Sequence, residues 1–391
     1  MKFQKNNPLH YFVYSLSFLI YTICIFIKFF NKKSKNNTIT LTGHKLIGNL
    51  EVLFRKQNQE GLIMNYITFS YQDYLDLKGL YKKNGLDENI FYVLNPLDIY
   101  KCLSSKLIIT SHGIFFHKFI TKYLNIKTLY AGHAIEGAYP IEKNNKLFRD
   151  LKNYSEVWMY SDFEKEMFLK DFKYPYKNLK VNGYPRVQYL IENKNKQIEL
   201  KSTNKINNKV VLYAPTASRN DKAFLHSTFS PFKLENLKKF EKFFKKLNTT
   251  LIIKTHLNDK FSLEVENYFK KSSFIKHTKN INVEYDYDFL IMSDMLLTDY
   301  STIYVDYLVL DKPIIFIAPP DPNKNRQYSK VIENSDIHRL LTFESLLSSI
   351  EYELSNNKQG GETALLKKLI FKDLNANKIL DNSFEAIKKL I

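Results

Sequence analysis

Short apolar runs alternate with amphipathic segments along most of this chain, and this alternation constrains its fold more than any other feature. In the first half, the runs of strand length are 62–69, 90–94, 106–110, 126–130, 156–160 and 180–182. The segments with helical spacing are 95–105, 114–124 and 161–172, the last of which opens with a capping box. Because strands separated by helices of this length pair in parallel, the pattern predicts βαβ units and a parallel sheet.

The alternation restarts after a polar stretch at 193–208, whose end we interpret as a domain boundary. In the second half, the runs of strand length are 210–213, 251–254, 295–298 and 313–317. The segments with helical spacing are 233–247, 263–270 and 301–310. A chain of 391 residues is long enough for two domains, each with its own core. We therefore predict an α/β protein with two Rossmann-like domains facing a cleft, residues 36–205 and 206–391.

A hydrophobic segment at the N-terminus stands apart from both domains. Residues 11–27 carry no charge, and Lys28, Lys32, Lys33 and Lys35 follow. About 17 residues is the lower limit for a spanning helix, and no small-residue cleavage site follows. We favour a membrane anchor over 1–35, whose basic flank keeps the protein at the cytoplasmic face of the cell membrane. An interfacial helix and a helix buried in the fold stay open. The polar residues after Lys35 indicate a short linker.

The chain is strongly basic, with 58 Lys and Arg against 40 Asp and Glu and a formal net charge of +18. Such an excess favours an anionic partner, although an A/T-rich coding bias also enriches lysine. The sequence has no zinc-finger, homeodomain or basic-zipper pattern, which argues against nucleic acid as the partner. Two cysteines, Cys24 and Cys102, are too few for a disulfide scaffold or a cysteine-rich metal site and fit a reducing cytoplasm.

Residues 298–302 (TDYST) lie directly between a predicted strand and a predicted helix. Ligands bind at this edge of open parallel sheets. The hydroxyls of Ser301 and Thr302, together with backbone N–H groups and the helix dipole, predict an anion site. A plain helix cap made by Asp299 or Ser301 is the alternative.

Two further strand ends in the second half carry cations and hydroxyls. Lys254 and His256 lie two residues apart after the strand LIIK, so both side chains project the same way, toward phosphate oxygens. Thr216 follows the strand VVLY, with Arg219 downstream, and a loop of this kind holds a pyrophosphate. A structural role for His256 is the alternative. The sequence has no Walker A loop, GxGxxG fingerprint or HExxH pattern.

The first half offers candidates for a general base. Gly132 and His133 follow the strand IKTLY, and the glycine allows a ligand to approach the backbone closely. A histidine there is suited to remove a proton from an attacking hydroxyl at neutral pH. His112 ends the preceding strand and competes for this role, and a structural role for either histidine stays open. The turn GYPR delivers Arg186 to the region between the domains.

In order and spacing, these segments resemble the CDP-glycerol glycerophosphotransferase family, the teichoic-acid and capsule polymerases. The resemblance covers roughly residues 111–328 and is most specific in its last segment. The segments read YAGHAIEG, VNGYPRV, YAPTASR, IKTHL and SDMLLTDYSTIYVDYLVLDKPIIF. The chain departs from the family pattern where glycine precedes rather than follows His133 and where Val187 and Leu257 replace Asn and Pro.

The resemblance implies a GT-B-like fold and transfer of an alditol-phosphate group from a CDP-linked donor. The acceptor would be a hydroxyl of an anionic cell-surface polymer or its lipid-linked primer, and CMP would leave. His133 would be the general base and His256 would hold the pyrophosphate. The other residues that the resemblance assigns to the donor phosphates are Thr216, Arg219, Lys254, Asp299, Ser301 and Thr302. The departures fall mostly on the acceptor side, so the alditol and the acceptor stay open.

Two other functions compete with this one. A nucleotide-sugar glycosyltransferase of the same architecture would grip the ribose with an acidic residue, for which Asp306 is a candidate, and would release a nucleoside diphosphate. A basic, non-enzymatic protein at the membrane would need neither His133 nor His256. We expect no cofactor held by the protein, because no carboxylates cluster in the sequence. Mg²⁺ bound to the donor pyrophosphate would need few protein ligands.

Overall fold

The computed structural model of the protein describes residues 8–30, 36–112, 123–133, 151–170, 177–215, 233–255, 261–299, 301–317, 338–339, 342–356, 360–372 and 375–391. The chain divides into two units. Unit 1 contains the described residues up to Gln188 together with Asn375–Ile391, and unit 2 contains those from Tyr189 to Lys372. Each unit is built around one sheet, as the alternating pattern predicts.

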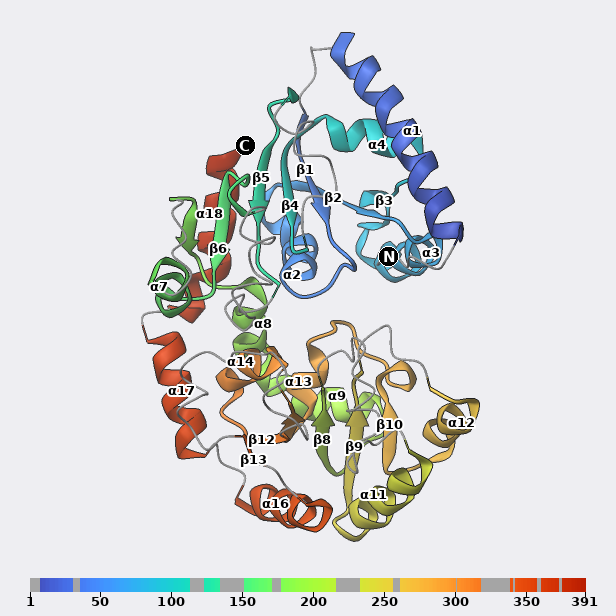
Figure 1. Ribbon diagram of the computed structural model, residues 1–391, viewed down its shortest axis with the longest axis vertical. Coiled ribbons are helices and arrows are strands. Elements are labelled where there is room, and N and C mark those ends of the chain that lie inside the picture. The colour runs from blue at the N-terminus through green and yellow to red at the C-terminus, as the bar shows by residue number, and fades with distance from the viewer. Residues whose placement is uncertain are drawn as a thin grey trace. The chain divides into compact units, whose positions relative to one another are not determined.

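Unit 1 contains a seven-stranded sheet in the order β3-β2-β1-β4-β5-β6-β7, in which every neighbouring pair is parallel (Figure 1). The strands are β1 (Asn36–Thr42), β2 (Ile63–Thr68), β3 (Ile90–Tyr92), β4 (Ser105–Thr110), β5 (Lys127–Tyr130), β6 (Glu156–Met159) and β7 (Leu179–Val181). Every strand predicted for this half of the chain is confirmed, with small shifts at its ends. Strand β1 is an addition.

Strand β1 lies at the centre of this sheet, between β2 and β4, where the sequence indicated a linker after Lys35. Thr40 and Thr42 are buried, and the Thr40 hydroxyl lies 2.8 Å from the Ser105 hydroxyl of β4. Hydroxyls on neighbouring strands thus satisfy each other inside the sheet. The linker was predicted only for the polar residues directly after Lys35, where β1 in fact begins. The strand was missed because a strand rich in threonine lacks the continuous apolar run that marks most buried parallel strands.

The helices of unit 1 that bear on the site are short and follow strands. They are α2 (Asn49–Lys56), α3 (Tyr71–Tyr81), α4 (Pro96–Leu103), α7 (Asp162–Lys170) and α8 (Pro185–Asn193), the last of which begins in unit 1 and continues past Gln188 into unit 2. The predicted capping box is present at the start of α7, because Glu164 N donates to Ser161 Oγ (3.4 Å). The predicted helix at 114–124 lies almost wholly outside the described residues.

The C-terminal helix α18 (Ile379–Leu390) belongs to unit 1, whereas the sequence placed all of 206–391 in the second domain. Three contacts hold the helix on unit 1. Leu380 N donates to Gln188 Oε1 (2.6 Å), Asn182 Nδ2 donates to Ser383 Oγ (2.7 Å), and Lys388 pairs with Glu60 (2.8 Å). The spacing of apolar residues predicts where a helix forms but not which unit it packs against. The sequence therefore could not show that the C-terminal helix belongs to unit 1.

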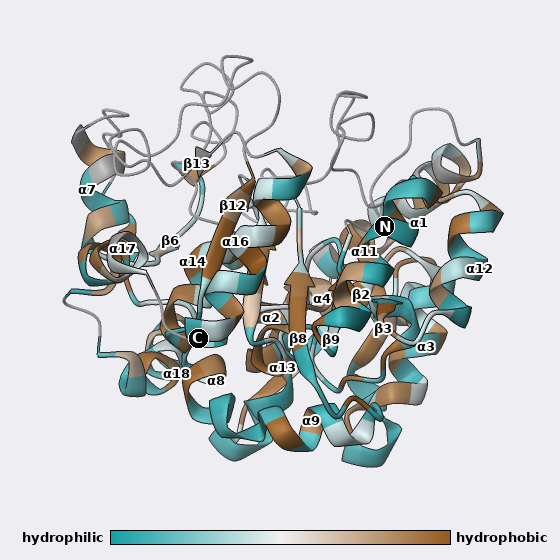
Figure 2. Ribbon diagram, turned by 90° about the horizontal axis from the view of Figure 1, so that it is seen from below, coloured by the Kyte–Doolittle hydropathy of each residue, from teal (hydrophilic) through white to brown (hydrophobic). Residues whose placement is uncertain are grey.

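Unit 2 contains a six-stranded parallel sheet in the order β10-β9-β8-β11-β12-β13. Its strands are β8 (Lys209–Tyr213), β9 (Thr249–Ile253), β10 (Ile275–His277), β11 (Met295–Thr298), β12 (Ile314–Ile317) and β13 (His338–Arg339). Its helices are α9 (Gln197–Thr203), α11 (Leu234–Lys246), α12 (Leu263–Lys271), α13 (Asp288–Met292), α14 (Ile303–Tyr307), α16 (Phe343–Asn356) and α17 (Gly361–Phe371). Strands β8 and β12 are hydrophobic along most of their length (Figure 2), as expected for parallel strands covered on both faces.

The helix predicted at 301–310 is shorter than expected. Helix α14 covers Ile303–Tyr307, and a 3₁₀ turn over Leu308–Leu310 continues it. The turn ends at Asp311, which adopts a left-handed conformation with φ of 58°.

The N-terminal hydrophobic segment forms helix α1 (Pro8–Phe30), and one of its faces packs on unit 1 beside α4. Val13, Tyr21 and Cys24 are buried in an apolar cluster that also contains residues of β2, β3 and α4. Lys28 Nζ donates to Ser104 Oγ (2.8 Å) and lies 5.2 Å from the centre of the Tyr100 ring. The helix is therefore attached to the folded unit.

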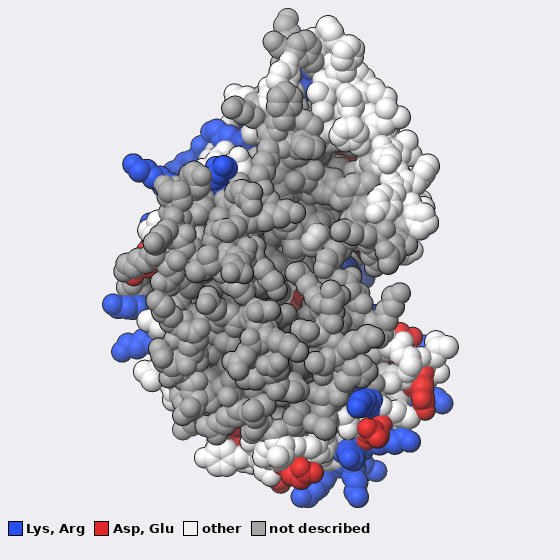
Figure 3. Space-filling model, in the orientation of Figure 1, with Lys and Arg blue, Asp and Glu red and all other residues white. Residues whose placement is uncertain are grey.

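The opposite face of α1 is apolar and exposed. Nine large side chains of the helix are each between 47% and 71% exposed: Leu9, Tyr11, Phe12, Phe18, Leu19, Ile23, Phe26, Ile27 and Phe30. The surface of α1 is almost uncharged (Figure 3). A helix wholly buried in the fold, one of the three alternatives, is thus contradicted. The segment 11–28 is long and apolar enough to cross a membrane. Both a spanning helix and an interfacial helix are consistent with it.

Candidate functional site

Three histidines gather at one edge of the unit 1 sheet. His44, His112 and His133 follow β1, β4 and β5, which are neighbours in the sheet. The rings of His44 and His112 are centred 4.3 Å apart, and those of His112 and His133 are centred 3.9 Å apart. His44 and His133 are exposed and His112 is half-buried. The two competing sequence candidates, His112 and His133, are therefore in direct contact with each other.

The position of His133 is fixed by the residue before it. Gly132 has φ of 74°, and a Cβ atom there would overlap the Tyr184 ring. Only glycine combines that conformation with such close packing. The carbonyls of Ala131 and Gly132 accept hydrogen bonds from Asn49 Nδ2 at 2.7 and 3.3 Å. The turn therefore presents His133 at a defined place on the sheet edge.

Asn49 links this turn to Arg186, the further candidate from the GYPR turn. Arg186 N donates to Asn49 Oδ1 (3.2 Å). Its buried guanidinium lies 4.7 Å from the centre of the Tyr184 ring and 5.9 Å from that of Tyr160. Within unit 1, Arg186 thus helps to hold the residues that pack against Gly132. This contact supports a structural role beside any role in binding.

In unit 2, the turn after β11 is organised by Asp299. Its Oδ1 accepts a hydrogen bond from Ser301 N (3.0 Å), and Asp299 is buried. Thr298 Oγ1 donates to the carbonyl of Ala214 (2.6 Å), which joins this turn to the end of β8. Ser301 and Thr302 are half-buried, and among the described residues neither hydroxyl has a hydrogen-bond partner. The carboxylate thus shapes the turn, and the hydroxyls are available to a ligand.

Lys254 follows β9 and is held near the same edge. Its ammonium pairs with Asp286 at 2.9 Å and lies 5.8 Å from the centre of the Phe289 ring. The next residue, Thr255, has its Oγ1 3.2 Å from Nε2 of His277. Lys254 follows β9, and Ser301 and Thr302 follow β11. Only β8 separates these two strands in the sheet, so the three residues lie at one edge of unit 2.

His277 is a structural histidine that sequence reasoning did not single out. It is buried between the rings of Phe261 and Phe269, and its Nδ1 accepts a hydrogen bond from Lys279 N (3.1 Å). Nε2 therefore carries the proton and donates to Thr255. Burial, together with the nearby charges of Lys279 and Lys254, lowers the pKa of His277 to about 4. The ring is neutral at neutral pH and supports the turn after Lys254.

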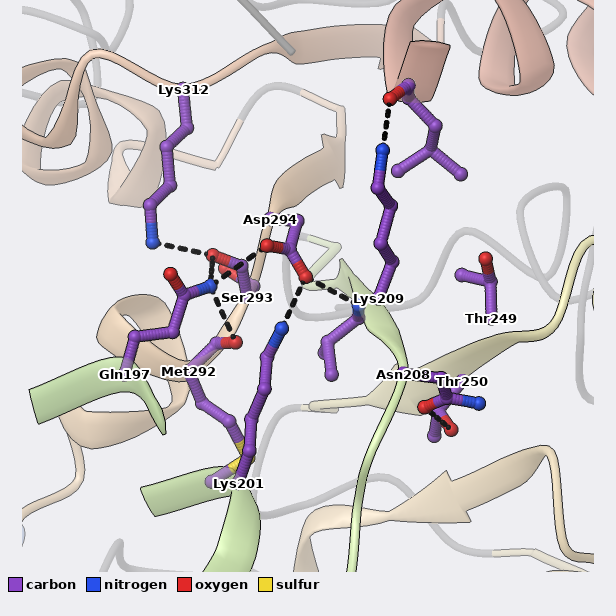
Figure 4. A network of polar contacts seen from close by, with 12 residues as sticks. Gln197, Lys201, Asn208, Lys209, Thr249, Thr250, Met292, Ser293, Asp294 and Lys312 are labelled. Carbon is purple, nitrogen blue, oxygen red and sulfur yellow. Dashed lines mark hydrogen bonds and ion pairs between the residues drawn. The ribbon is translucent and has the colours of Figure 1, made fainter. Parts of the chain in front are cut away.

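The beginning of β11 carries a second polar cluster, which Figure 4 shows from close by. Lys201 Nζ lies 2.6 Å from Asp294 Oδ2, which also accepts from Val210 N (2.7 Å). Gln197 Nε2 donates to the other Asp294 oxygen, Oδ1 (2.9 Å), and Lys312 Nζ donates to the carbonyl of Ser293 (2.7 Å). The cluster joins α9, β8 and β12 to the start of β11.

This cluster changes the interpretation of the segment 293–317. Ser293, Asp294 and Lys312 lie at the amino end of β11, whereas ligands bind at the carboxyl end. Burial lowers the pKa of Lys312 to about 8, and its ammonium donates to backbone carbonyls of the same unit. Within the segment, the carboxyl-end turn at 298–302 is the part that is placed to bind a ligand.

The remaining sequence candidates fall into two groups. His256, Thr216 and Arg219 lie outside the described residues. Asp306, the ribose candidate, is buried, and its Oδ2 accepts a hydrogen bond from the Tyr287 hydroxyl (3.1 Å). Among the described residues, no group of three or more His, Cys, Asp or Glu is arranged to hold a metal ion.

His44 and Asn49 are site residues that the sequence did not suggest. Both follow β1, and because that strand was not identified in the sequence, its carboxyl end was not recognised as a place where ligands bind. The alternation of threonine with isoleucine and leucine in NNTITLT was the signal that could have revealed it.

A protein-family model matches most of the chain. The family is described as CDP-Glycerol:Poly(glycerophosphate) glycerophosphotransferase, and the match covers residues 26–363. This range contains His44, His112, His133 and the turn after β11.

Several curated proteins are similar in sequence. The teichoic acid glycerol-phosphate primase of Bacillus subtilis is 26% identical over 250 residues, 59% of this chain and 61% of that protein. The teichoic acid ribitol-phosphate polymerase TarL of Staphylococcus aureus is 25% identical over 173 residues, 43% of this chain and 29% of that protein. The chain thus spans about three fifths of the first relative and about three tenths of the second.

Solved structures share the fold. A structure of the wall teichoic acid polymerase TagF, soaked with CDPG, matches with a TM-score of 0.66 and 14% identity, over 90% of this chain and 88% of that one. The UDP-GlcNAc 2-epimerase of Neisseria meningitidis bound to UDP-GlcNAc matches with a TM-score of 0.56 and 14% identity, over 90% and 99% of the two chains. The expected α/β fold of GT-B-like type is confirmed.

Proposed function

The chain belongs to the CDP-glycerol:poly(glycerophosphate) glycerophosphotransferase family, and from this premise we propose that it transfers an alditol-phosphate group from a CDP-linked donor. The acceptor is a hydroxyl of an anionic cell-surface polymer or its lipid-linked primer, and CMP is released. The observation that carries the proposal is the placement of His133, which Gly132 and Asn49 present at the carboxyl edge of the unit 1 sheet.

The proposed reaction is an in-line substitution at the β-phosphorus of the donor. The acceptor oxygen forms a bond to that phosphorus, and the bond from the phosphorus to the bridging oxygen breaks, so that CMP leaves. His133 takes the proton of the attacking hydroxyl. Positioning and charge stabilisation supply most of the catalysis in phosphoryl transfer, because little covalent chemistry is left to the protein.

The proposed donor site lies at the carboxyl edge of unit 2. Ser301 and Thr302 donate hydroxyl hydrogens to phosphate oxygens, and Lys254 supplies positive charge. Thr216, Arg219 and His256 extend this site by their resemblance to the family pattern. We propose that any Mg²⁺ enters with the donor pyrophosphate, since the described carboxylates form no metal cluster.

The proposed site of action is the cytoplasmic face of the cell membrane. Helix α1 supports this location because one face is fixed to unit 1 while the other exposes a row of apolar side chains. Lys28, which was expected to belong to the basic flank, is instead buried against unit 1. Lys32, Lys33 and Lys35, which follow the helix in the sequence, favour anionic lipid. An interfacial helix keeps its contacts with α4, so we favour it over the spanning anchor.

Vesicle flotation tests the membrane proposal. We expect a Phe12→Ser, Phe26→Ser double variant to lose binding to anionic vesicles, because both side chains lie on the exposed face of α1. The matched control is Ile198→Ser with Leu263→Ser, which removes two apolar side chains from unit 2 that are even more exposed than Phe12 and Phe26. Equal flotation of both double variants and the wild type would contradict a role for α1.

Product analysis tests the transfer itself. The full chain is incubated with an acceptor and, in turn, CDP-glycerol, CDP-ribitol and UDP-sugars, with and without Mg²⁺. We expect CMP from a CDP-alditol. Release of UDP from a UDP-sugar, without CMP from any CDP-alditol, would replace the proposal by a glycosyltransferase.

A further inference from the structure

His44 and His112 have no task in the proposed reaction, although His112 packs on the proposed base and His44 packs on His112. The rings lie in a row at the ends of three adjacent strands, with centres 4.3 and 3.9 Å apart. Removal of a proton from one hydroxyl needs one of them. The other two call for a separate explanation.

The protein contains a structural histidine for comparison. His277 is buried, packs between two phenylalanine rings, and has both ring nitrogens bonded to its own unit. His44, in contrast, is exposed, and its ring packs on another imidazole. An exposed stack of imidazoles gains little from burial of apolar surface. Core packing therefore accounts for His277 and does not account for the stack.

The chemistry of the stack favours an anion. A protonated imidazole has two N–H donors and no acceptor. Two imidazolium ions at this separation repel each other, and an anion that accepts hydrogen bonds from the ring N–H groups at the side of the stack offsets the repulsion. The Ser111 hydroxyl lies 2.7 Å from His112 Nδ1 and fixes that ring. It also lies 3.0 Å from the point where a Cβ on Gly43 would be, so the turns after β1 and β4 are in close contact.

The position of the stack indicates which anionic group of the proposed reaction binds there. The donor phosphates belong to unit 2 in the proposed function, whereas the stack ends at the base that faces the acceptor hydroxyl. In an acceptor that ends in an alditol phosphate, one alditol unit separates the reactive hydroxyl from the nearest phosphate. A site for that phosphate must therefore be a neighbour of the base.

We propose that His44 and His112 bind the last phosphate group of the acceptor and thereby place its terminal hydroxyl on His133. The inference rests on the proposed function and sharpens it. The chain extends acceptors that already end in an alditol phosphate in preference to acceptors that end in a neutral sugar or alditol.

Steady-state kinetics with two acceptors test this inference. One acceptor ends in glycerol phosphate, and its matched partner ends in the same alditol without the phosphate. For the variants His44→Gln and His112→Gln, we expect the KM for the phosphate-containing acceptor to rise about tenfold or more. A rise of this size corresponds to the loss of a hydrogen bond to a charged group. The KM for the neutral acceptor and the KM for the CDP-linked donor stay unchanged.

Two further variants separate binding from general effects. His44→Lys keeps a cation and is expected to preserve most of the acceptor affinity. Lys82→Gln removes an exposed cation before β3, at the amino edge of the same sheet, and should leave every constant unchanged. Matching unfolding midpoints would show that the histidine variants are folded.

Binding of glycerol 3-phosphate to the full chain, measured by calorimetry against glycerol, gives a readout that needs no turnover. We expect binding by the wild type and about tenfold or greater weakening in each glutamine variant. Unchanged affinity in both variants, or equal KM changes for the two acceptors, would overturn the inference. Absence of CMP release by the wild type would instead count against the proposed function, and the calorimetry would still decide the phosphate site.

Discussion

Strand β11 has polar side chains at both of its ends, and the two ends differ in what those side chains contact. At the amino end, the carboxylate of Asp294 pairs with Lys201 and accepts hydrogen bonds from Gln197 and from the backbone of β8. At the carboxyl end, the hydroxyls of Ser301 and Thr302 have no hydrogen-bond partner among the described residues. Polar groups bonded within the protein stabilise the fold, whereas polar groups left open at the carboxyl edge are suited to bind a ligand.

A contrast in burial appears between the two units' histidines. His133 is exposed at the carboxyl edge of unit 1, and His277 is buried at the carboxyl edge of unit 2. Position at the carboxyl edge is therefore not sufficient to mark a functional residue. Exposure distinguishes the two roles, and substitutions at both kinds of position test this.

The largest effect is expected for His133→Ala. Loss of a general base lowers the rate of transfer by roughly a hundredfold to ten-thousandfold. The free energy of unfolding should be unchanged, because the side chain is exposed. Measurement of CMP release and of urea unfolding checks both. A variant that keeps the wild-type rate would remove His133 from the mechanism.

His277 should make unit 2 sensitive to acid. Its pKa is about 4 in the folded chain, below its ordinary value of 6.5. Above pH 6.5 the contribution to stability is complete. Between pH 6.5 and 4 the unfolded chain binds a proton that the folded chain does not, so up to about 3 kcal/mol of stability is lost as pH falls.

Urea unfolding between pH 7.5 and 4.5 measures this loss. The variant His277→Gln should be less stable at pH 7.5, and its free energy of unfolding should depend less on pH. Parallel pH profiles for the variant and the wild type would show that another group is responsible.

Two lysines provide a matched test of the amino-end cluster. Lys201 and Lys367 each form an ion pair of 2.6 Å, but the pair with Asp294 is 14% and 16% exposed, whereas the pair with Asp311 is 31% and 61% exposed. We expect Lys201→Met to lower the free energy of unfolding by about 2 kcal/mol. Lys367→Met should cost less than about 1 kcal/mol. Equal costs would mean that burial does not distinguish the pairs.

The smallest effect is expected at the carboxyl-end turn. Ser301→Ala and Thr302→Val each remove one hydroxyl from the proposed donor site. We expect the KM for the CDP-linked donor to rise about tenfold for each variant, with the acceptor KM and the stability unchanged. A loss of stability without a change in donor KM would show that these hydroxyls serve the fold.

Much of the fold was predictable, because parallel strands that are covered on both faces leave apolar runs in the sequence. The strands from β2 to β7 were recognised in this way. Strand β1 escaped because its buried positions include Thr40 and Thr42. The return of α18 to unit 1 depends on contacts such as that of Leu380 with Gln188, which join positions far apart in the chain.

The site was predictable in part, for a related reason. His133 and Ser301 were found because they follow recognised strands. His44 was not found because β1 was not. Within the segment 293–317, the sequence predicted an anion site at 298–302, and the structure adds a separate cluster around Asp294 at the amino end of β11. Sequence order shows which residues flank a strand, and only the structure shows which of them are already bonded.

The most direct test of the proposed transfer follows each phosphorus of the donor. The full chain is supplied with an acceptor and with CDP-glycerol labelled in either the α- or the β-phosphorus. Attack at the β-phosphorus predicts that the β-label appears in the acceptor product and the α-label in CMP. Recovery of both labels together in a nucleoside diphosphate would contradict the account.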